Sequence, residues 1–302
     1  MNRITTHKFI REEQRYLLPN DFGRWSRNKR KMAKPFADLT ARYFLDSRIR
    51  KNIALLKEQQ PNRVLGETHC HSTFSDGSHS VSSILKRASR LGLDYVVITD
   101  HLIPGKFLID NIVTSAKEQA RCLHEWDETY KPVKAYPAFE ISTTEGHLVI
   151  ILDPDYLSVE KSGDLALQFS DFDYRFVSML DVIPRIAPFG GISIVAHPEK
   201  KRTHPFGASI SWVKENLLGL VDGIEDLSSG HGYQENYAED LGLASIGSSD
   251  DHFNLLTGTA VTGYDGSEHN DLISAVKARQ TEAVSVENSL QHLLTVARKI
   301  IL

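Results

Sequence analysis

The segment Val64–His101, VLGETHCHSTFSDGSHSVSSILKRASRLGLDYVVITDH, decides the fold. Its first part, VLGETHCHS, predicts a short strand. Residues 80–91 predict a helix, because apolar side chains recur there at helical spacing and Gly92 follows as a C-terminal cap. The run DYVVITD is continuously apolar, as a strand buried on both faces requires. The segment therefore predicts a strand, a helix and a second strand, in the order that builds a parallel sheet.

The same alternation continues toward the C-terminus. Helices are expected at 111–130, 171–190, 209–219, 233–242 and 270–280, and strands at 133–142, 147–153, 191–197, 221–227, 243–252 and 281–286, with a closing helix after them. About seven strand–helix units favour an α/β barrel of the (β/α)7, TIM-like kind over an open sheet.

Charge is distributed unevenly along the 302 residues. Residues 1–60 carry 15 Lys+Arg against 6 Asp+Glu, whereas the remainder carries 20 against 33. We therefore divide the chain into a basic, mainly helical N-terminal extension, residues 1–63, that packs on the barrel, and a barrel domain with a C-terminal helix, residues 64–302. The densest basic stretch, Arg24–Phe36, suits a solvated arm or a helix on the barrel exterior better than a nucleic-acid site, because no known nucleic-acid fold accompanies it.

Composition limits the class of protein. No apolar run approaches the roughly 20 residues that span a bilayer, and the N-terminus is polar and charged where a signal peptide would be apolar. Two cysteines, Cys70 and Cys122, are too few for a disulfide framework. We expect a cytoplasmic globular protein without a membrane partner.

Side chains that can bind metals follow the predicted strands at the points where the strands end. They are His69, His71, Asp100, His101, Glu140, His197, Asp250 and His252. In a (β/α) barrel these ends meet on one face, where active sites are built. His69 and His71 share a strand face because side chains two residues apart on a strand point the same way. His147 is a further candidate ligand.

Neighbouring residues have simpler explanations. Cys70 points away from His69 and His71, so a core position suits it better than metal binding. We interpret Glu225 as a loop carboxylate in preference to a ligand, and Asp251 as a residue beside the ligand pair. His79 opens the following helix and lies outside the pattern.

The ordered motifs THCHSTFSDGS, GLDYVVITDH, AFEISTTEGHLVII, IVAHPEK and IGSSDDH resemble the PHP (polymerase and histidinol phosphatase) family of metal-dependent phosphoesterases. The resemblance spans about Val64–Val286. It implies a distorted (β/α)7 barrel with a cluster of two or three divalent metal ions, Mn, Zn or Fe. The implied ligands are His69, His71, Asp76, His101, Glu140, His147, His197, Asp250 and His252.

Nine side chains are too many for one ion of about four ligands, so two or three ions sharing bridging carboxylates are expected, with Glu140 and Asp250 as the bridges. Such a cluster would hydrolyse a phosphate ester with a metal-bound hydroxide as the nucleophile. The expected substrate is a nucleotide or another small phosphorylated metabolite, whose phosphate Lys106, Lys200 or Arg202 would contact. A nucleic acid is an alternative ligand but not a required one.

Two other functions fit parts of the pattern. An amidohydrolase that cleaves C–N bonds also opens its barrel with His-x-His, but it commonly uses a strand-borne lysine and a single aspartate. A non-catalytic PHP module of a nucleic-acid enzyme commonly lacks ligands, whereas this set looks complete. Phosphoester hydrolysis is therefore the favoured function.

Overall fold

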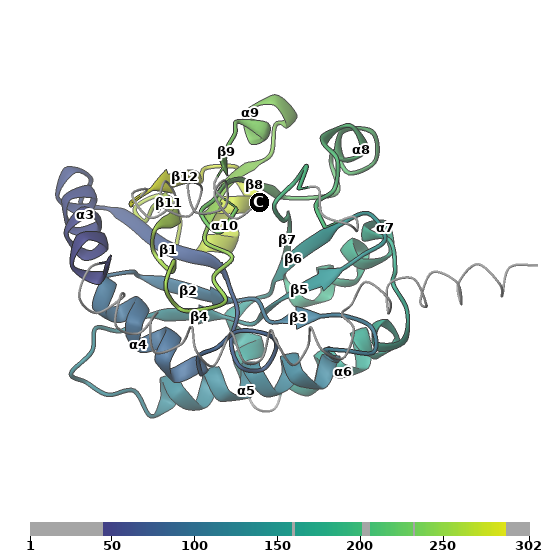
Figure 1. Ribbon diagram of the computed structural model, residues 1–302, viewed down its shortest axis with the longest axis horizontal. Coiled ribbons are helices and arrows are strands. Elements are labelled where there is room, and N and C mark those ends of the chain that lie inside the picture. The colour runs from purple at the N-terminus through teal and green to yellow at the C-terminus, as the bar shows by residue number, and fades with distance from the viewer. Residues whose placement is uncertain (1–44, 159–160, 201–205, 232, 288–302) are drawn as a thin grey trace, which may run out of the picture.

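The computed structural model describes residues 45–158, 161–200, 206–231 and 233–287. They form an α/β fold in which helices surround two hydrogen-bonded sheets (Figure 1). The first sheet contains β1 (Arg63–Cys70), β2 (Tyr95–Ile98), β4 (Lys134–Tyr136), β11 (Ala260–Asp265) and β12 (Glu282–Ser285), in the order β12-β11-β1-β2-β4.

The second sheet contains β3 (His101–Leu102), β5 (Ala138–Ser142), β6 (His147–Ile151), β7 (Ile192–Val195), β8 (Gly223–Ser228) and β10 (Ala244–Ser248), in the order β10-β8-β7-β6-β5-β3, and β9 (Tyr233–Gln234) pairs with β8. An isolated parallel bridge between Cys70 and Asp251 links the two sheets. Hydrogen bonds among the described residues thus leave two sheets and do not close one continuous barrel.

Strand directions follow the prediction only in part. β1, β2 and β4 are parallel, as are β7, β8 and β10, but β6 runs antiparallel to both β5 and β7, and β11 runs antiparallel to β1 and β12. The turn 143–146 between β5 and β6 is too short for a crossover helix, so these two strands can pair only antiparallel. The start of β6 consequently lies at the same edge as the end of β5.

Proline explains two further departures from the expected elements. The single strand expected at 133–142 is divided at Pro137 into β4 and β5, which belong to different sheets. Proline has no N–H for a ladder bond, so the chain can change sheets there. Pro184 and Pro188 similarly interrupt the helix expected at 171–190. It is replaced by the short elements η3 (Ser170–Tyr174), α7 (Met179–Val182), η4 (Ile183–Arg185) and η5 (Ala187–Phe189).

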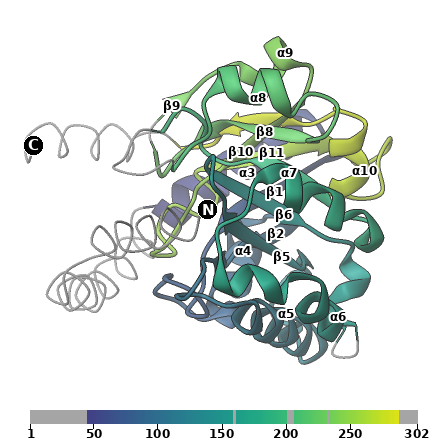
Figure 2. The same cartoon turned by 90° about the vertical axis from the view of Figure 1, so that its right-hand side faces the viewer.

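The longer helices lie outside the sheets. They are α3 (Asp46–Gln59), α4 (Val81–Leu91), α5 (Ile109–His124), α6 (Ser162–Phe169), α8 (Ile210–Asn216), α9 (Tyr237–Leu241) and α10 (Leu272–Lys277), with η2 (Pro154–Leu157) as a short link. Helices α4, α5 and α6 lie along one side, and α8 and α9 lie on the opposite side (Figures 1 and 2). The side chain of Ser80 accepts from Ser83 N at the start of α4, and Gly92, with φ 86°, ends it as predicted.

Helix α3 is the part of the predicted N-terminal extension that the structure describes. Ile49 and Ile53 of α3 are buried in the same apolar cluster as Leu85 and Leu91 of α4. Arg48 pairs with Glu287 at 2.9 Å, which fastens α3 to the segment after β12. Residues 1–44, and the closing helix expected after residue 287, lie outside the described residues.

Candidate metal centre

All nine predicted ligands lie around one region at the strand ends. His69 is in β1 and His71 follows it, Glu140 is in β5, and His197 follows β7. His147 stands at the start of β6, and the antiparallel pairing of β5 with β6 brings it opposite Ser142 at the end of β5. A histidine at the beginning of a strand thus joins residues that stand at the ends of others.

The ligand atoms gather into four overlapping groups, within each of which they lie within 4.8 Å of one another. The groups are His69, His71, Glu140 and Asp250; His71, Asp76, His101 and His252; His101, Glu140 and His147; and His197, His231 and Asp250. Because the groups share members, they form one continuous cluster, which we call the histidine–carboxylate cluster.

Glu140 is the centre of this cluster and is fully buried. Its Oε1 lies 2.6 Å from His147 Nδ1 and 3.0 Å from His197 Nε2, while its Oε2 lies 2.9 Å from His101 Nδ1 and 3.2 Å from His69 Nε2. Burial alone would raise the pKa of this carboxyl, but the surrounding imidazoles, His147 foremost, hold it well below its usual range. Glu140 is therefore an ionised carboxylate shared among several imidazoles.

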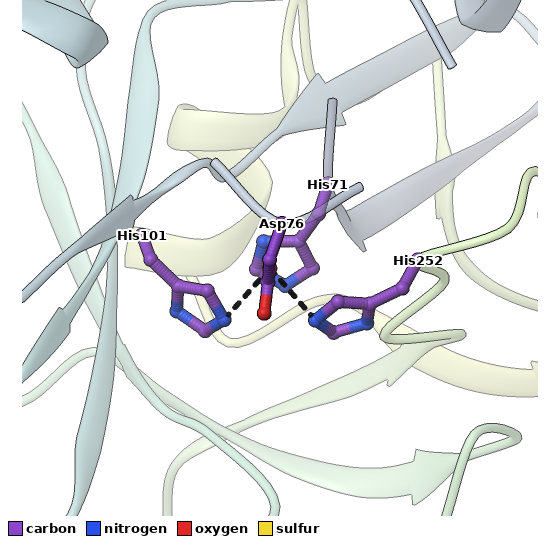
Figure 3. A group of neighbouring side chains, drawn as sticks. All are labelled: His71, Asp76, His101 and His252. Atoms are coloured by element: carbon purple, nitrogen blue, oxygen red, sulfur yellow. Dashed lines mark ion pairs between the residues drawn. The ribbon is translucent and has the colours of Figure 1, made fainter. Parts of the chain in front are cut away.

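Asp76 occupies a second part of the cluster, between His101 and His252 (Figure 3). Its Oδ1 lies 3.1 Å from His252 Nε2 and 3.4 Å from His101 Nε2. Gly77 makes this placement possible, because a Cβ there would overlap the carbonyl of His71. The turn can fold back onto the end of β1 only with glycine at this position.

Asp250 faces two sides of the cluster with its two oxygens. Its Oδ1 lies 3.0 Å from His71 Nε2, and its Oδ2 lies 2.7 Å from His231 Nε2. The backbone of Asp250 has φ 47°, in the left-handed region that aspartate tolerates better than most residues. Burial would raise the pKa of Asp250, but nearby imidazoles, beginning with His69, keep it well below its usual range.

The cluster fits divalent cations. Among the described residues, the buried atoms His69 Nε2, His101 Nδ1, His197 Nδ1 and Glu140 Oε2 make no hydrogen bond, although several lie close to a carboxylate or an imidazole. Buried polar atoms without partners cost free energy, and a cation shared among them would remove that cost. Mixed imidazole and carboxylate donors suit Zn, Fe and Mn.

Glu225 supports the cluster from behind and is not the loop carboxylate we expected. It lies within β8, is buried, and accepts from His69 Nδ1 at 2.8 Å and from Ser248 Oγ at 2.6 Å, while its other oxygen accepts from His197 N at 2.7 Å. Burial would raise the pKa of Glu225, but the neighbouring imidazoles, His69 before His197, lower it. Glu225 thus holds the His69 ring with Nε2 directed into the cluster.

Asp100 and Asp251 accept hydrogen bonds that hold loops in place, and neither belongs to the four groups of ligand atoms. Asp100 accepts from the hydroxyls of Ser72, Ser75 and Ser115 at 2.6–2.7 Å, and from Ser72 N at 2.8 Å. It thereby ties the turn that carries Asp76 to α5.

Asp251 accepts from the backbone N–H groups of Phe253, Leu256 and Thr257 at 2.7–2.9 Å, which fixes the loop around His252. Cys70 points away from the cluster, and its Sγ lies 3.4 Å from the Val97 carbonyl.

Two of the three predicted phosphate-contacting cations, Lys106 and Lys200, have partners among the described residues. Lys200 Nζ donates to the His231 carbonyl at 2.9 Å. Lys106 Nζ lies 4.8 Å from the centre of the Phe107 ring, which in turn stacks on His101. Arg202 lies outside the described residues.

His231 is the member of the cluster that the sequence did not single out. It lies in the turn after β8, between two glycines, and not on a strand with a partner two residues away. The available signal was its position four residues after the buried strand predicted at 221–227, which itself contains no histidine.

An α/β fold with a buried cluster of histidines and carboxylates at its strand ends is consistent with the binding of several metal ions. Residues 67–159 match the model of the PHP domain. This part of the chain therefore matches the PHP domain, as the sequence motifs predicted. Among curated proteins, none matches it.

Three solved structures are similar to this one. PsfC from Pseudomonas syringae shares 19% identity over 80% of this chain and 98% of its own, with a TM-score of 0.52. A protein from Bifidobacterium adolescentis assigned to the metal-dependent phosphoesterases shares 18% over 63% of this chain and 88% of its own, with a TM-score of 0.44. A two-domain protein from Bacteroides vulgatus with a PHP-like domain shares 18% over 74% of this chain and 65% of its own, with a TM-score of 0.49.

The described helices include none that combines the length and the apolar character needed to cross a membrane.

Proposed function

We propose that this protein is a metal-dependent phosphoesterase that hydrolyses a nucleotide or another small phosphorylated metabolite. The observation that carries the proposal is Glu140, a buried carboxylate whose two oxygens lie within 3.2 Å of nitrogen atoms of four imidazoles. One carboxylate in contact with so many potential ligands is typical of a bridge between metal ions.

Three sets of side chains would hold the ions, which we propose to be Mn, Zn or Fe. His69, His71, Glu140 and Asp250 form one set, and Asp76 with His101 and His252 forms another. Glu140 with His147 and His197 forms the third, because both imidazoles contact its Oε1. When bound, ions in such an arrangement lower the pKa of a coordinated water and neutralise phosphate oxygens.

The protein's own groups position the site. Glu225 orients His69, and Asp100 and Asp251 fix the loops that carry Asp76 and His252. We propose that Lys106 and Lys200 contact the substrate phosphate after local rearrangement. We also propose that the two sheets are the halves of a distorted (β/α)7 barrel, supported by the bridge between Cys70 and Asp251.

The test is hydrolysis of p-nitrophenyl phosphate by manganese-loaded protein, with His69→Ala as the variant and His124→Ala, an exposed histidine of α5, as the matched control. We expect His69→Ala to abolish the activity without changing the far-UV circular dichroism, and the control to keep it. Retained activity in His69→Ala would overturn the proposal.

A second panel separates the possible substrates. Monoesters, 3',5'-bisphosphates, cyclic nucleotides and short oligonucleotides would be compared with lactams and hydantoins on the same manganese-loaded protein. Turnover of phosphate esters alone supports the proposal, and turnover of the lactams or hydantoins alone would replace it with C–N hydrolysis.

A further inference from the structure

The turn after β8 is held directly against the loop that carries Asp250. Ser229 N donates to the Ser248 carbonyl at 3.0 Å, and Gly230 N donates to the Ser249 carbonyl at 2.8 Å. A Cβ on Gly230 would overlap the Ser249 carbonyl, so glycine permits this approach. The backbone of His231 is therefore fixed beside Asp250.

The His231 side chain enters the cluster. It is 6% exposed, its Nε2 lies 2.7 Å from Asp250 Oδ2, and its ring centre lies 4.8 Å from that of His197. Ligand atoms of His197, His231 and Asp250 all lie within 4.8 Å of one another, as in the other three groups.

The two oxygens of Asp250 make the same kind of contact on opposite sides. Oδ1 meets the imidazole of His71, which belongs to a predicted ligand set, and Oδ2 meets the imidazole of His231. His197 Nδ1 is buried and makes no hydrogen bond to any residue that the structure describes, so this side of the cluster also contains an atom suited to a cation.

We infer that His231 is a tenth metal ligand, which binds a cation together with His197 and Asp250. This inference rests on the proposed metal cluster. It extends the ligand set to the turn after β8, the strand whose Glu225 hydrogen-bonds to His69 and His197.

The alternative role for His231 is to donate a hydrogen bond to Asp250 without binding metal. His231→Gln separates the two roles, because a glutamine amide can still donate to Asp250 Oδ2 but offers no imidazole nitrogen as a ligand. His231→Ala removes both functions, and His124→Gln on the exposed surface of α5 serves as the matched control.

The measurement is the number and affinity of bound ions after dialysis of the full chain against Zn²⁺ buffered with a chelator. We expect both His231 variants to lose one equivalent of bound Zn²⁺, or to bind it at least about tenfold more weakly. About tenfold is the smaller loss of affinity usual when a residue that hydrogen-bonds to a metal ligand is replaced. The visible spectrum of the Co²⁺-loaded protein should change in His231→Gln, because one nitrogen leaves the coordination shell.

Three outcomes would count against the inference. Wild-type stoichiometry and affinity in His231→Gln, with loss only in His231→Ala, would show that the hydrogen bond matters and the ligand role does not. Unchanged binding in both variants would overturn the inference while leaving the proposed function in place. Absence of metal from the wild-type protein would overturn both. Far-UV circular dichroism of the metal-free variants checks that each has folded. If His231→Ala does not fold, the metal binding of His231→Gln alone decides between the two roles of His231.

Discussion

Glu225 and His69 are joined by a 2.8 Å hydrogen bond between a carboxylate oxygen and Nδ1, and the other nitrogen of the same ring lies 3.2 Å from Glu140. A carboxylate behind a ligand histidine fixes the tautomer and the orientation of the ring. Orientation of His69 by Glu225 has a measurable consequence for metal binding.

Replacement of Glu225 by glutamine should weaken metal binding about 10- to 100-fold, the usual cost of losing such a partner, with little change in fold. The measurement is competition for Zn²⁺ with a coloured chelator. Asp226→Asn is the matched control, because Asp226 lies on the same strand but accepts from Ser245 and Ala238 away from the cluster. Equal losses in both variants would indicate a general effect on β8 and not orientation of His69.

Replacement of Gly77 by alanine should displace the turn that carries Asp76, because the new Cβ would overlap the His71 carbonyl. We expect weaker binding of the ion held by Asp76, His101 and His252, measured as a lower metal content. The control is Gly163→Ala in α6, where a Cβ would meet no atom within 4 Å. A Gly77→Ala protein with full metal content would contradict the role assigned to this turn.

The Arg87 side chain is 2% exposed, lies 2.9 Å from Asp46 of α3, and donates to the Leu255 carbonyl at 3.2 Å. Arg87→Met should lower the free energy of unfolding by about 3 kcal/mol, since it leaves partners of a buried pair unsatisfied. Arg90→Met, on the exposed face of the same helix, should change it by less than about 0.5 kcal/mol. Urea denaturation of both variants provides the comparison, and similar values would mean that the Arg87 pair contributes little.

The stability of the metal-free protein should depend on pH through His252. Burial would lower the pKa of His252, but Asp76 and Asp250 raise it from 6.5 to about 10. A raised pKa in the folded state stabilises the fold below pH 6.5, and this contribution disappears as the pH rises toward 10. The free energy of unfolding should therefore fall over that interval.

His252→Gln should flatten this part of the profile, measured by chemical denaturation between pH 6 and 10 after chelation. The matched control is His269→Gln, which alters a half-buried histidine outside the cluster. Parallel profiles for His252→Gln and the wild type would show that another group dominates the titration.

Motif spacing, strand ends and the resemblance to the PHP family together predicted the nine side chains that meet. His69 and His71 followed from the alternation of a strand, and His101, His197 and Asp250 from the convergence of strand ends. His147 reaches the cluster by a different route, an antiparallel turn that sequence periodicity does not reveal.

Other features depend on contacts between distant segments and so could not be predicted from local patterns. Glu225 was interpreted as a loop carboxylate, because the residues around it do not reveal that β8 buries it beside His69. His231 stands alone in a glycine turn and meets Asp250 only because two loops are held together by backbone hydrogen bonds. The division into two sheets likewise follows from Pro137 and from short turns, not from hydrophobic periodicity.

Asp100 has a consequence for how proteins related to this one diverge. Its oxygens accept hydrogen bonds from the hydroxyls of Ser72, Ser75 and Ser115, which come from two separate segments. Loss of the aspartate would leave three hydroxyls without their acceptor, and loss of the serines would leave a buried charge. We expect these four positions to be inherited as a set, so that an apolar residue at position 100 in a relative would be accompanied by replacement of the serines.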